Sequence, residues 1–194
     1  MPIQIQRTQL RAALYFAGVH DVRQYLNGVY VEPTAAMTRL TSSTGTVLSI
    51  QRRPVAGNVG VPAMIVPRAA CEHAVSLKIE HLTIEPAESG FSIGGAGPGR
   101  YLFHPVDGQF PDVRRIVPAA PSGEPANFIP EQLMAFARAG KALGVKGAPI
   151  VRQNGNAGAL VHFYAYDHFI GVLMPTSGFT DKRPDLGFPT WAGE

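Results

Sequence analysis

The residues that could carry acid-base, nucleophilic or metal chemistry are few and scattered along this chain of 194 residues. The single cysteine, Cys71, lies in an alanine-rich stretch with helical spacing, which is typical of a packing residue and not of a nucleophile. Among the six histidines, only His162 and His168 lie close together, beside Asp167, and they lack the paired spacing of a metal site on a helix. The sequence therefore predicts no catalytic residues, no metal and no cofactor, which leaves a hydrolase or metalloenzyme as a distant alternative.

A glycine-rich stretch at residues 94–99 could be mistaken for a phosphate-binding loop. Such loops bind phosphate because they lead into the N-terminus of a helix. Here the stretch leads into Arg100–His104, which has the composition of a strand. A loop between strands is the better interpretation.

Composition and charge bound the classes of protein that this chain can belong to. A hydrophobic content of 45% is enough to bury a sizeable core without disulfides, and a single cysteine cannot form one within the chain. No apolar run approaches the roughly 20 residues that span a bilayer, so we expect a soluble, cytoplasmic protein with no membrane contact. The net charge of +3 fits weak contact with a polyanion.

Three helical patterns recur along the chain. The first covers Thr8–Ala17, with Thr8 as the expected N-cap and an apolar face. The second runs from Pro67 to Leu77, and the third from Pro130 to Leu143, each with proline at the expected first helical position. The apolar faces comprise Leu10, Ala13, Leu14 and Ala17 in the first helix, and Leu133, Phe136, Ala137 and Gly140 in the third.

Strand-like segments follow each helical pattern. They are 24–32, 37–40 and 46–52 after the first, 81–85, 90–93 and 100–105 after the second, and 149–153, 160–166 and 168–174 after the third. The helices begin about 60 residues apart, so the chain contains three copies of one helix-plus-strands unit. We expect an α+β fold with the helices on one face of antiparallel sheets.

The repeats predict a domain organisation. Two units, about 6–66 and 67–118, form a domain at 1–118; a linker covers 119–129, a third unit covers 130–175 and an extended tail covers 176–194. Two units can pair their sheets under two helices, whereas a third unit is left without a partner. The odd unit therefore predicts self-association.

Residues 108–118 join the second unit to the third through a Pro turn followed by two arginines. Together with 21–29 and 170–175, this stretch resembles the bacterial replicative sliding clamp, the ring-shaped β subunit that encircles DNA and tethers polymerase. The chain resembles the central clamp domain plus a half of the last domain. The resemblance implies a noncatalytic clamp-like fold whose helices line a DNA hole.

The resemblance also implies a partner-peptide groove at the junction of the two domains. The family's Phe-Pro-Asp-Tyr-Arg-Arg-Val segment falls on 110–116, and its Val-Val-Met-Pro segment falls on 172–175. A third family segment falls on 43–48, where only Gly45 and Leu48 match. The expected groove residues are Gly45, Leu48, Pro111, Arg115, Ile116, Val172, Met174 and Pro175. Its apolar members could take up a leucine and an aromatic side chain.

DNA contact is expected from basic side chains on the helices. Arg7 and Arg11 are four residues apart, and Arg138 and Lys141 are three apart, so each pair shares a helix face. The full expected set is Arg7, Arg11, Arg68, Lys78, Arg138 and Lys141. Without any base-reading motif, contact would be to phosphates and independent of sequence.

The tail carries the run Pro184–Phe188, which is similar to the acidic-Leu-Phe peptides that bind clamps. We therefore hypothesise that the tail can occupy the groove of its own or a neighbouring chain. A disordered or packing tail is the alternative.

The function predicted first is a sliding-clamp-like replication and repair processivity factor that binds DNA, DNA polymerase and other clamp-motif proteins. It would form a homo-oligomer, since three units per chain make twelve in a tetramer, the number of helices in the family's ring. The alternative is a non-encircling clamp-fold adaptor or decoy for clamp-interacting proteins, which the departures at 44, 46 and 47 and the modest charge favour.

Overall fold

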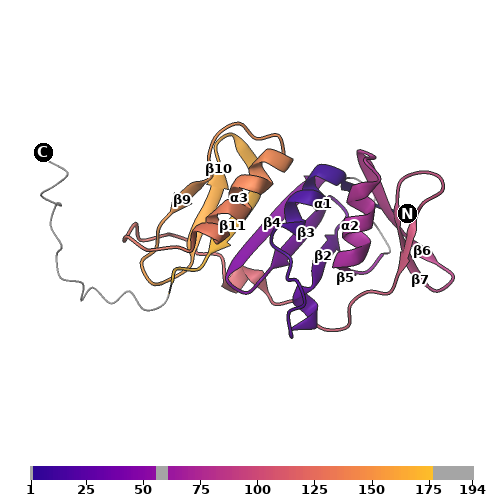
Figure 1. The fold of residues 1–194 in the computed structure, drawn as a ribbon, viewed down its shortest axis with the longest axis horizontal. Helices are drawn as coiled ribbons and strands as arrows, with labels where there is room; N and C mark the ends of the chain where they lie inside the picture. The colour runs from indigo at the N-terminus through magenta and orange to yellow at the C-terminus, as the bar shows by residue number, and fades with distance from the viewer. Residues whose placement is uncertain (1, 56–60, 177–194) are drawn as a thin grey trace, which may run out of the picture.

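The computed structural model describes residues 2–55 and 61–176, in which helices cover one face of two antiparallel sheets (Figure 1). The helices of this described part are α1 (Arg7–Leu14), α2 (Arg68–Ser76) and α3 (Pro130–Ala142), with the short 3-10 turns η1 (Gln24–Leu26) and η2 (Val113–Arg115). The predicted α+β class, with helices on one face of antiparallel strands, is confirmed.

In the described residues, three strands follow each helix, and one more strand directly precedes each of α1 and α2. They are β1 (Ile3–Gln6), β2 (Gly28–Pro33), β3 (Met37–Ser43), β4 (Val47–Pro54), β5 (Met64–Pro67), β6 (His81–Ala87), β7 (Gly90–Gly94), β8 (Tyr101–Phe103), β9 (Ile150–Arg152), β10 (Ala159–Phe163) and β11 (Tyr166–Leu173). The nine strands expected after the helices are present with shifted ends. The sequence patterns missed β1 and β5, two short strands that directly precede α1 and α2.

Several helix details differ from the sequence expectations. Helix α1 begins at Arg7 after Gln6, so Thr8 is not its N-cap, and Pro67 lies just outside α2 instead of at its first position. Pro130 does occupy the first turn of α3. In α3 the buried alanine is Ala139, whereas Ala137 is exposed to solvent.

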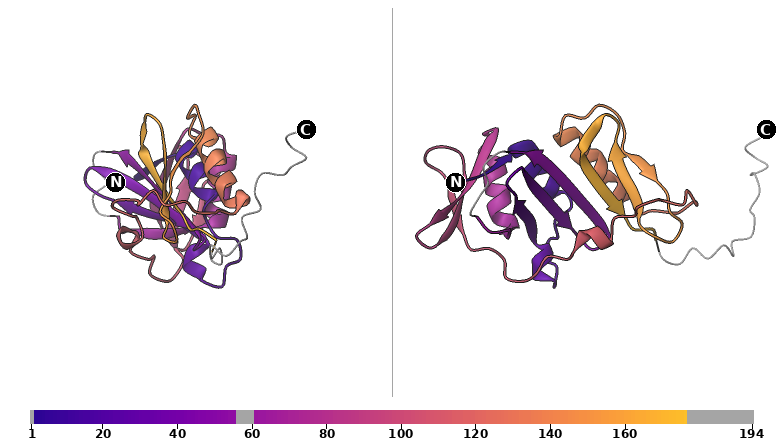
Figure 2. Two further views of the ribbon diagram at one scale, coloured as in Figure 1. Left: turned by 90° about the vertical axis from the view of Figure 1, so that its left-hand side faces the viewer. Right: turned by 180° about the vertical axis from the view of Figure 1, so that it is seen from behind.

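The first two units exchange strands when each unit is counted from the strand before its helix, which is β1 for the first unit and β5 for the second. Strand β1 pairs with β6 in a sheet of order β1-β6-β7-β8, and β5 pairs with β2 at one end of a sheet of order β5-β2-β3-β4-β11-β10-β9. Helices α1 and α2 pack together over one apolar core. The rear view shows the strands on the side opposite the helices (Figure 2).

The last strand of the third unit joins it to the first unit. Strand β11 pairs with β4 in register Val172 with Leu48 and Leu173 with Val47, so one sheet runs through both units. Helix α3 packs beside α1, where the rings of Phe16 and Phe136 lie 4.8 Å apart in an edge-to-face contact. Helix α1 therefore lies between α2 and α3 (Figure 1). The domain boundaries themselves stay a prediction.

Candidate functional site

A pocket opens on the seam where β4 of the first unit pairs with β11 of the third. Its volume of about 210 Å³ is below the range of roughly 300 to 1,000 Å³ for pockets that enclose a whole small molecule, so it suits a few inserted side chains. The lining residues are Arg23, Tyr25, Leu26, Ser43, Gly45, Thr46, Val47, Leu48, Pro111, Ile116, Val172 and Met174.

The floor of the pocket is apolar and fixed by the sheet. Leu48 and Val172 are register partners across the seam, and both side chains are almost fully buried. Leu26, from η1, is buried in the same cluster. An alternating strand pattern puts such residues on one face, so the pairing of two distant strands creates a floor that neither strand has alone.

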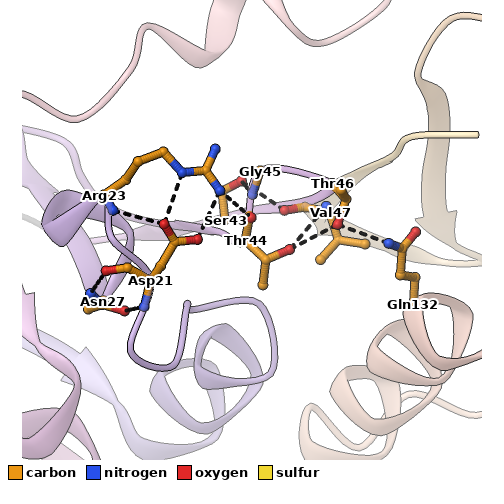
Figure 3. A network of polar contacts seen from close by, with 9 residues as sticks. All are labelled: Asp21, Arg23, Asn27, Ser43, Thr44, Gly45, Thr46, Val47 and Gln132. Atoms are coloured by element: carbon orange, nitrogen blue, oxygen red, sulfur yellow. Dashed lines mark hydrogen bonds and ion pairs between the residues drawn. The ribbon is translucent and has the colours of Figure 1, made fainter. Parts of the chain in front are cut away.

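Arg23 forms a polar wall on one side (Figure 3). Its guanidinium donates to both carboxylate oxygens of Asp21, at 3.0 and 2.8 Å, and to the carbonyl of Thr44 at 3.0 Å. These bonds hold the pKa of Asp21 at about 2, below its ordinary value, because the hydrogen bonds from Arg23 favour the ionised carboxylate. The arginine thus ties the segment before η1 to the turn between β3 and β4.

Two further contacts fix the ends of this wall (Figure 3). The side chain of Asn27 accepts from the Asp21 amide at 2.8 Å and donates to the Asp21 carbonyl at 2.7 Å, which closes the loop that carries Arg23. On the other side, Gln132 of α3 donates to the hydroxyl of Thr46 at 2.9 Å. Helix α3 of the third unit therefore also holds the turn between β3 and β4.

Gly45 is required at the tip of that turn. Its φ of +93° is in the region that favours glycine, and a Cβ there would lie 2.7 Å from both terminal nitrogens of Arg23. The close approach of the arginine to the backbone therefore depends on the missing side chain.

The remaining wall comes from the stretch around η2. Asp112 caps η2 by accepting from the Arg114 amide at 3.2 Å, and the ring of Phe110 stacks on Tyr30 with 5.1 Å between centroids. This anchors Pro111 and Ile116 at the mouth of the pocket, where Ile116 is 43% exposed. An exposed apolar rim over a buried apolar floor is suited to receive apolar side chains.

Comparison with known proteins finds similarity over part of the sequence and over most of the fold. No family model matches the chain. The β sliding clamp of Caulobacter vibrioides is 32% identical over 108 residues, which cover 50% of this chain and 28% of the clamp. The clamp of Escherichia coli K12 is 29% identical over 121 residues, which cover 61% of this chain and 33% of the clamp.

Solved clamps superpose on most of the chain. The polymerase III β subunit of Caulobacter crescentus covers 91% of it with a TM-score of 0.71 at 17% identity, and a Bartonella birtlesii clamp bound to griselimycin covers 91% with a TM-score of 0.69 at 17% identity. The chain is similar to the bacterial β sliding clamps over part of its sequence and in its fold. It is also shorter, since it spans 66% of those two solved clamp chains. The sequence resemblance to a shortened clamp is confirmed.

Most of the groove expected from the clamp resemblance comes together in the structure. Gly45, Leu48, Pro111, Ile116, Val172 and Met174 line the pocket. Arg115 and Pro175 do not line it, and the Arg115 side chain is 88% exposed. Arg115 lies on a 3-10 turn whose buried residue is Val113, so its side chain points away from the core that carries the pocket.

The groove residues expected from the clamp resemblance did not include pocket residues from two segments. Tyr25, Leu26 and Arg23 belong to the stretch 21–29, which carried part of the resemblance but was not assigned to the groove. Ser43, Thr46 and Val47 lie on the turn where the chain departs from the family's residues. The turn residues flank Gly45 and Leu48, which were assigned, whereas 21–29 was marked only by its part in the resemblance.

The basic residues expected to face DNA divide into two groups. Arg11, Arg138, Lys141 and Lys78 are exposed, and Arg7 is half-buried. Arg68 differs, because its guanidinium donates to the carbonyl of Ala17 at 2.9 Å and to Glu72 at 2.8 Å. Its charge is thereby engaged in holding α2 against the end of α1.

Groups with other chemistry are isolated in the described residues. No cluster of three or more His, Cys, Asp or Glu residues there could hold a metal ion. Cys71 is buried, and desolvation raises the pKa of its thiol to about 12. Within the same ranges, no helix is both long and apolar enough to cross a membrane. The tail hypothesis lies outside the described residues.

Proposed function

We propose that this chain is a small sliding-clamp-like processivity factor without catalytic activity, acting in the cytoplasm. It would hold short peptides of DNA polymerase and other clamp-motif proteins in the seam pocket and contact DNA phosphates without sequence specificity. The observation that carries this proposal is the pocket, in which three segments far apart in sequence meet at the β4–β11 seam. The chain covers only part of its clamp relatives, so their names support the proposal without deciding it.

The chemistry of the pocket favours a peptide with leucine and aromatic side chains. Full burial of each such side chain contributes roughly 1.5 to 3 kcal/mol, and the apolar floor supplies the surface. Met174, at the rim, can adapt its flexible thioether to different side chains.

Peptide binding tests the proposal directly. A fluorescent peptide that ends in an acidic residue, leucine and phenylalanine should bind the native chain, as measured by anisotropy. Met174→Asp, which puts a charge into the rim, should weaken binding by about tenfold or more, since a loss near 1.4 kcal/mol is tenfold.

Met134→Asp is the matched control, because Met134 is exposed on α3 and does not line the pocket. It should bind like the native chain. Equal affinities for the native chain and both variants, or no binding at all, would remove the groove from the proposal.

Encirclement is tested separately from peptide binding. A ring should stay on nicked circular DNA and slide off the same DNA once it is linear. A chain that binds the peptide but leaves both DNA forms equally is the adaptor that the sequence left as the alternative.

A further inference from the structure

The first two units show how a unit of this fold completes itself. The strand before each helix leaves its own unit and pairs with the first strand after the other unit's helix: β1 with β6, and β5 with β2. Helices α1 and α2 pack side by side above this exchange. In this exchange each unit pairs its strand before the helix with the other unit's first strand after the helix. Two equal halves related by a two-fold axis have this reciprocal topology.

The third unit has the same parts but lacks a partner to exchange with. Its first strand after the helix, β9, pairs with β10 along one edge, while the other edge ends the sheet in the described part of the chain. Residues 126–129 precede α3 as β1 precedes α1, yet they form no strand. Backbone bonds from Gly123 to Gln153 and from Gly155 to Glu124 hold the preceding stretch beside the end of β9.

Helix α3 presents a bare apolar flank on the same side. Its Phe136 packs on Phe16 of α1, while a Cβ on Gly140 would meet Phe163 of β10, so the helix surface turns from α1 towards β9. At 3.6 residues per turn this order continues to Leu133 and Ala137, four residues apart. No described helix lies beyond this flank (Figure 1).

Ala137 is more exposed than its place in the apolar sequence pattern predicts. The apolar spacing assigned Ala137 to the inward stripe of α3, yet the residue is exposed in the single chain. Ile129, at the start of α3, is 41% exposed. A small residue such as Ala137 lets two helices approach closely, and alanines of both α1 and α2 are buried in the core that these two helices share.

We propose that this surface binds the same surface of a second copy of the chain about a two-fold axis. Helix α3 packs against the partner's α3 through Ala137. Residues 126–129 of each copy pair with the partner's β9, in place of the bonds that join Ala126 to Gln153 and Asn127 to Thr176 within one chain. The second copy fits because the exchange needs a segment before a helix and an open first strand after it, and the odd unit offers both. Because the same surface is used on both copies, the contact ends at two copies, and it covers the β9 edge of each. The inference deepens the oligomer that forms part of the proposed function.

A charge at the centre of this contact tests it. Ala137→Glu would place two like charges at the axis, and its exposure means that the single chain should still fold. Light scattering after gel filtration should show the mass of the native assembly falling by about twofold. Ala69→Glu, at an exposed alanine of α2, should leave the mass unchanged.

Crosslinking gives a second measurement. Ala137→Cys should form a disulfide between copies under mild oxidation, whereas Ala69→Cys should not, and the native Cys71 is fully buried and silent. A monomeric native chain, an Ala137→Glu variant of native mass, or equal crosslinking of both cysteine variants would overturn the inference. Because the seam pocket lies on the other side of the third unit's sheet, Ala137→Glu should keep native peptide affinity. Loss of peptide binding alone would count against the groove and not against this contact.

Discussion

At the scale of single residues, the groove depends on a few positions whose roles are steric or electrostatic. Arg23 is held by Asp21, which stays ionised down to about pH 2, so this wall should be intact throughout the neutral range. Its guanidinium lies close to where a Cβ on Gly45 would be, so a side chain at this position would displace the arginine. The effect of a side chain at Gly45 on Arg23 can be separated from the effect of backbone strain by comparing two glycine variants.

Gly45→Ala should lower both stability and peptide affinity. A non-glycine residue at φ +93° costs roughly 1 to 3 kcal/mol, and the added Cβ would also push the Arg23 guanidinium away. Urea unfolding measures the first effect, and anisotropy with the fluorescent peptide measures the second.

Gly97→Ala provides the matched control. Gly97 has φ +110°, but no atom lies within 4 Å of the position that a Cβ would occupy, so only the backbone strain is shared. It should lose stability and keep peptide affinity. If both variants bind peptide equally well, Arg23 is not part of the groove wall.

At the scale of elements, the helix layer combines exposed basic residues with one arginine that has a structural role. Arg68 donates to the carbonyls of Leu14, Ala17 and Gly18, at the C-terminal end of α1, where carbonyls lack helical partners. Arg11, on α1, is exposed. The two arginines were grouped by sequence but should respond differently to removal.

Arg68→Ala should destabilise the fold by roughly 1 to 3 kcal/mol, because it leaves partly buried carbonyls without their charged donor. Arg11→Ala should leave the unfolding midpoint in urea nearly unchanged. In DNA binding the expected order reverses: Arg11→Ala should reduce the dependence of affinity on salt by about one phosphate contact.

Fluorescence anisotropy with double-stranded DNA over a range of salt concentrations measures this contact. Arg114→Ala is the control, since Arg114 is 82% exposed on η2, beside the groove and away from the helix layer. An Arg11→Ala variant with the salt dependence of the native chain would exclude α1 from DNA contact.

At the scale of the whole molecule, the sheet edges limit how copies can assemble. Strands β4 and β11 are each the third strand after their unit's helix, and they pair with each other. Strand β8 is the third strand after α2, and it ends the four-stranded sheet of the described residues. By the same rule, β8 can pair with β8 of another copy.

Contacts at both β8 and β9 predict a tetramer, whose twelve helices match the ring implied by the clamp resemblance. Leu102→Lys, at a β8 residue that is 63% exposed, should halve the native mass by protecting the edge. Combined with Ala137→Glu it should give a monomer. Light scattering of the two single variants and the double variant checks this, and a stable native monomer at micromolar concentration would contradict it.

The sequence by itself determined what local spacing can encode. Helical periodicity located the three α-helices of the described residues, and alternating apolar residues located the nine strands that follow them. Short motifs indicated Pro111, Ile116, Val172 and Met174 as groove residues. It missed β1 and β5 because strands of four residues hold too little alternation to stand out.

Only the tertiary structure decided which distant segments meet. The β4–β11 pairing set the floor of the pocket. The hydrogen bond from Arg23 to Thr44 placed that arginine over the turn of Gly45, η2 left Arg115 in solvent, and Arg68 met the carbonyls at the end of α1. The physical reason is that hydrogen-bonded strand registers and helix-end carbonyls are matched in space, between residues whose separation along the chain carries no periodic signal.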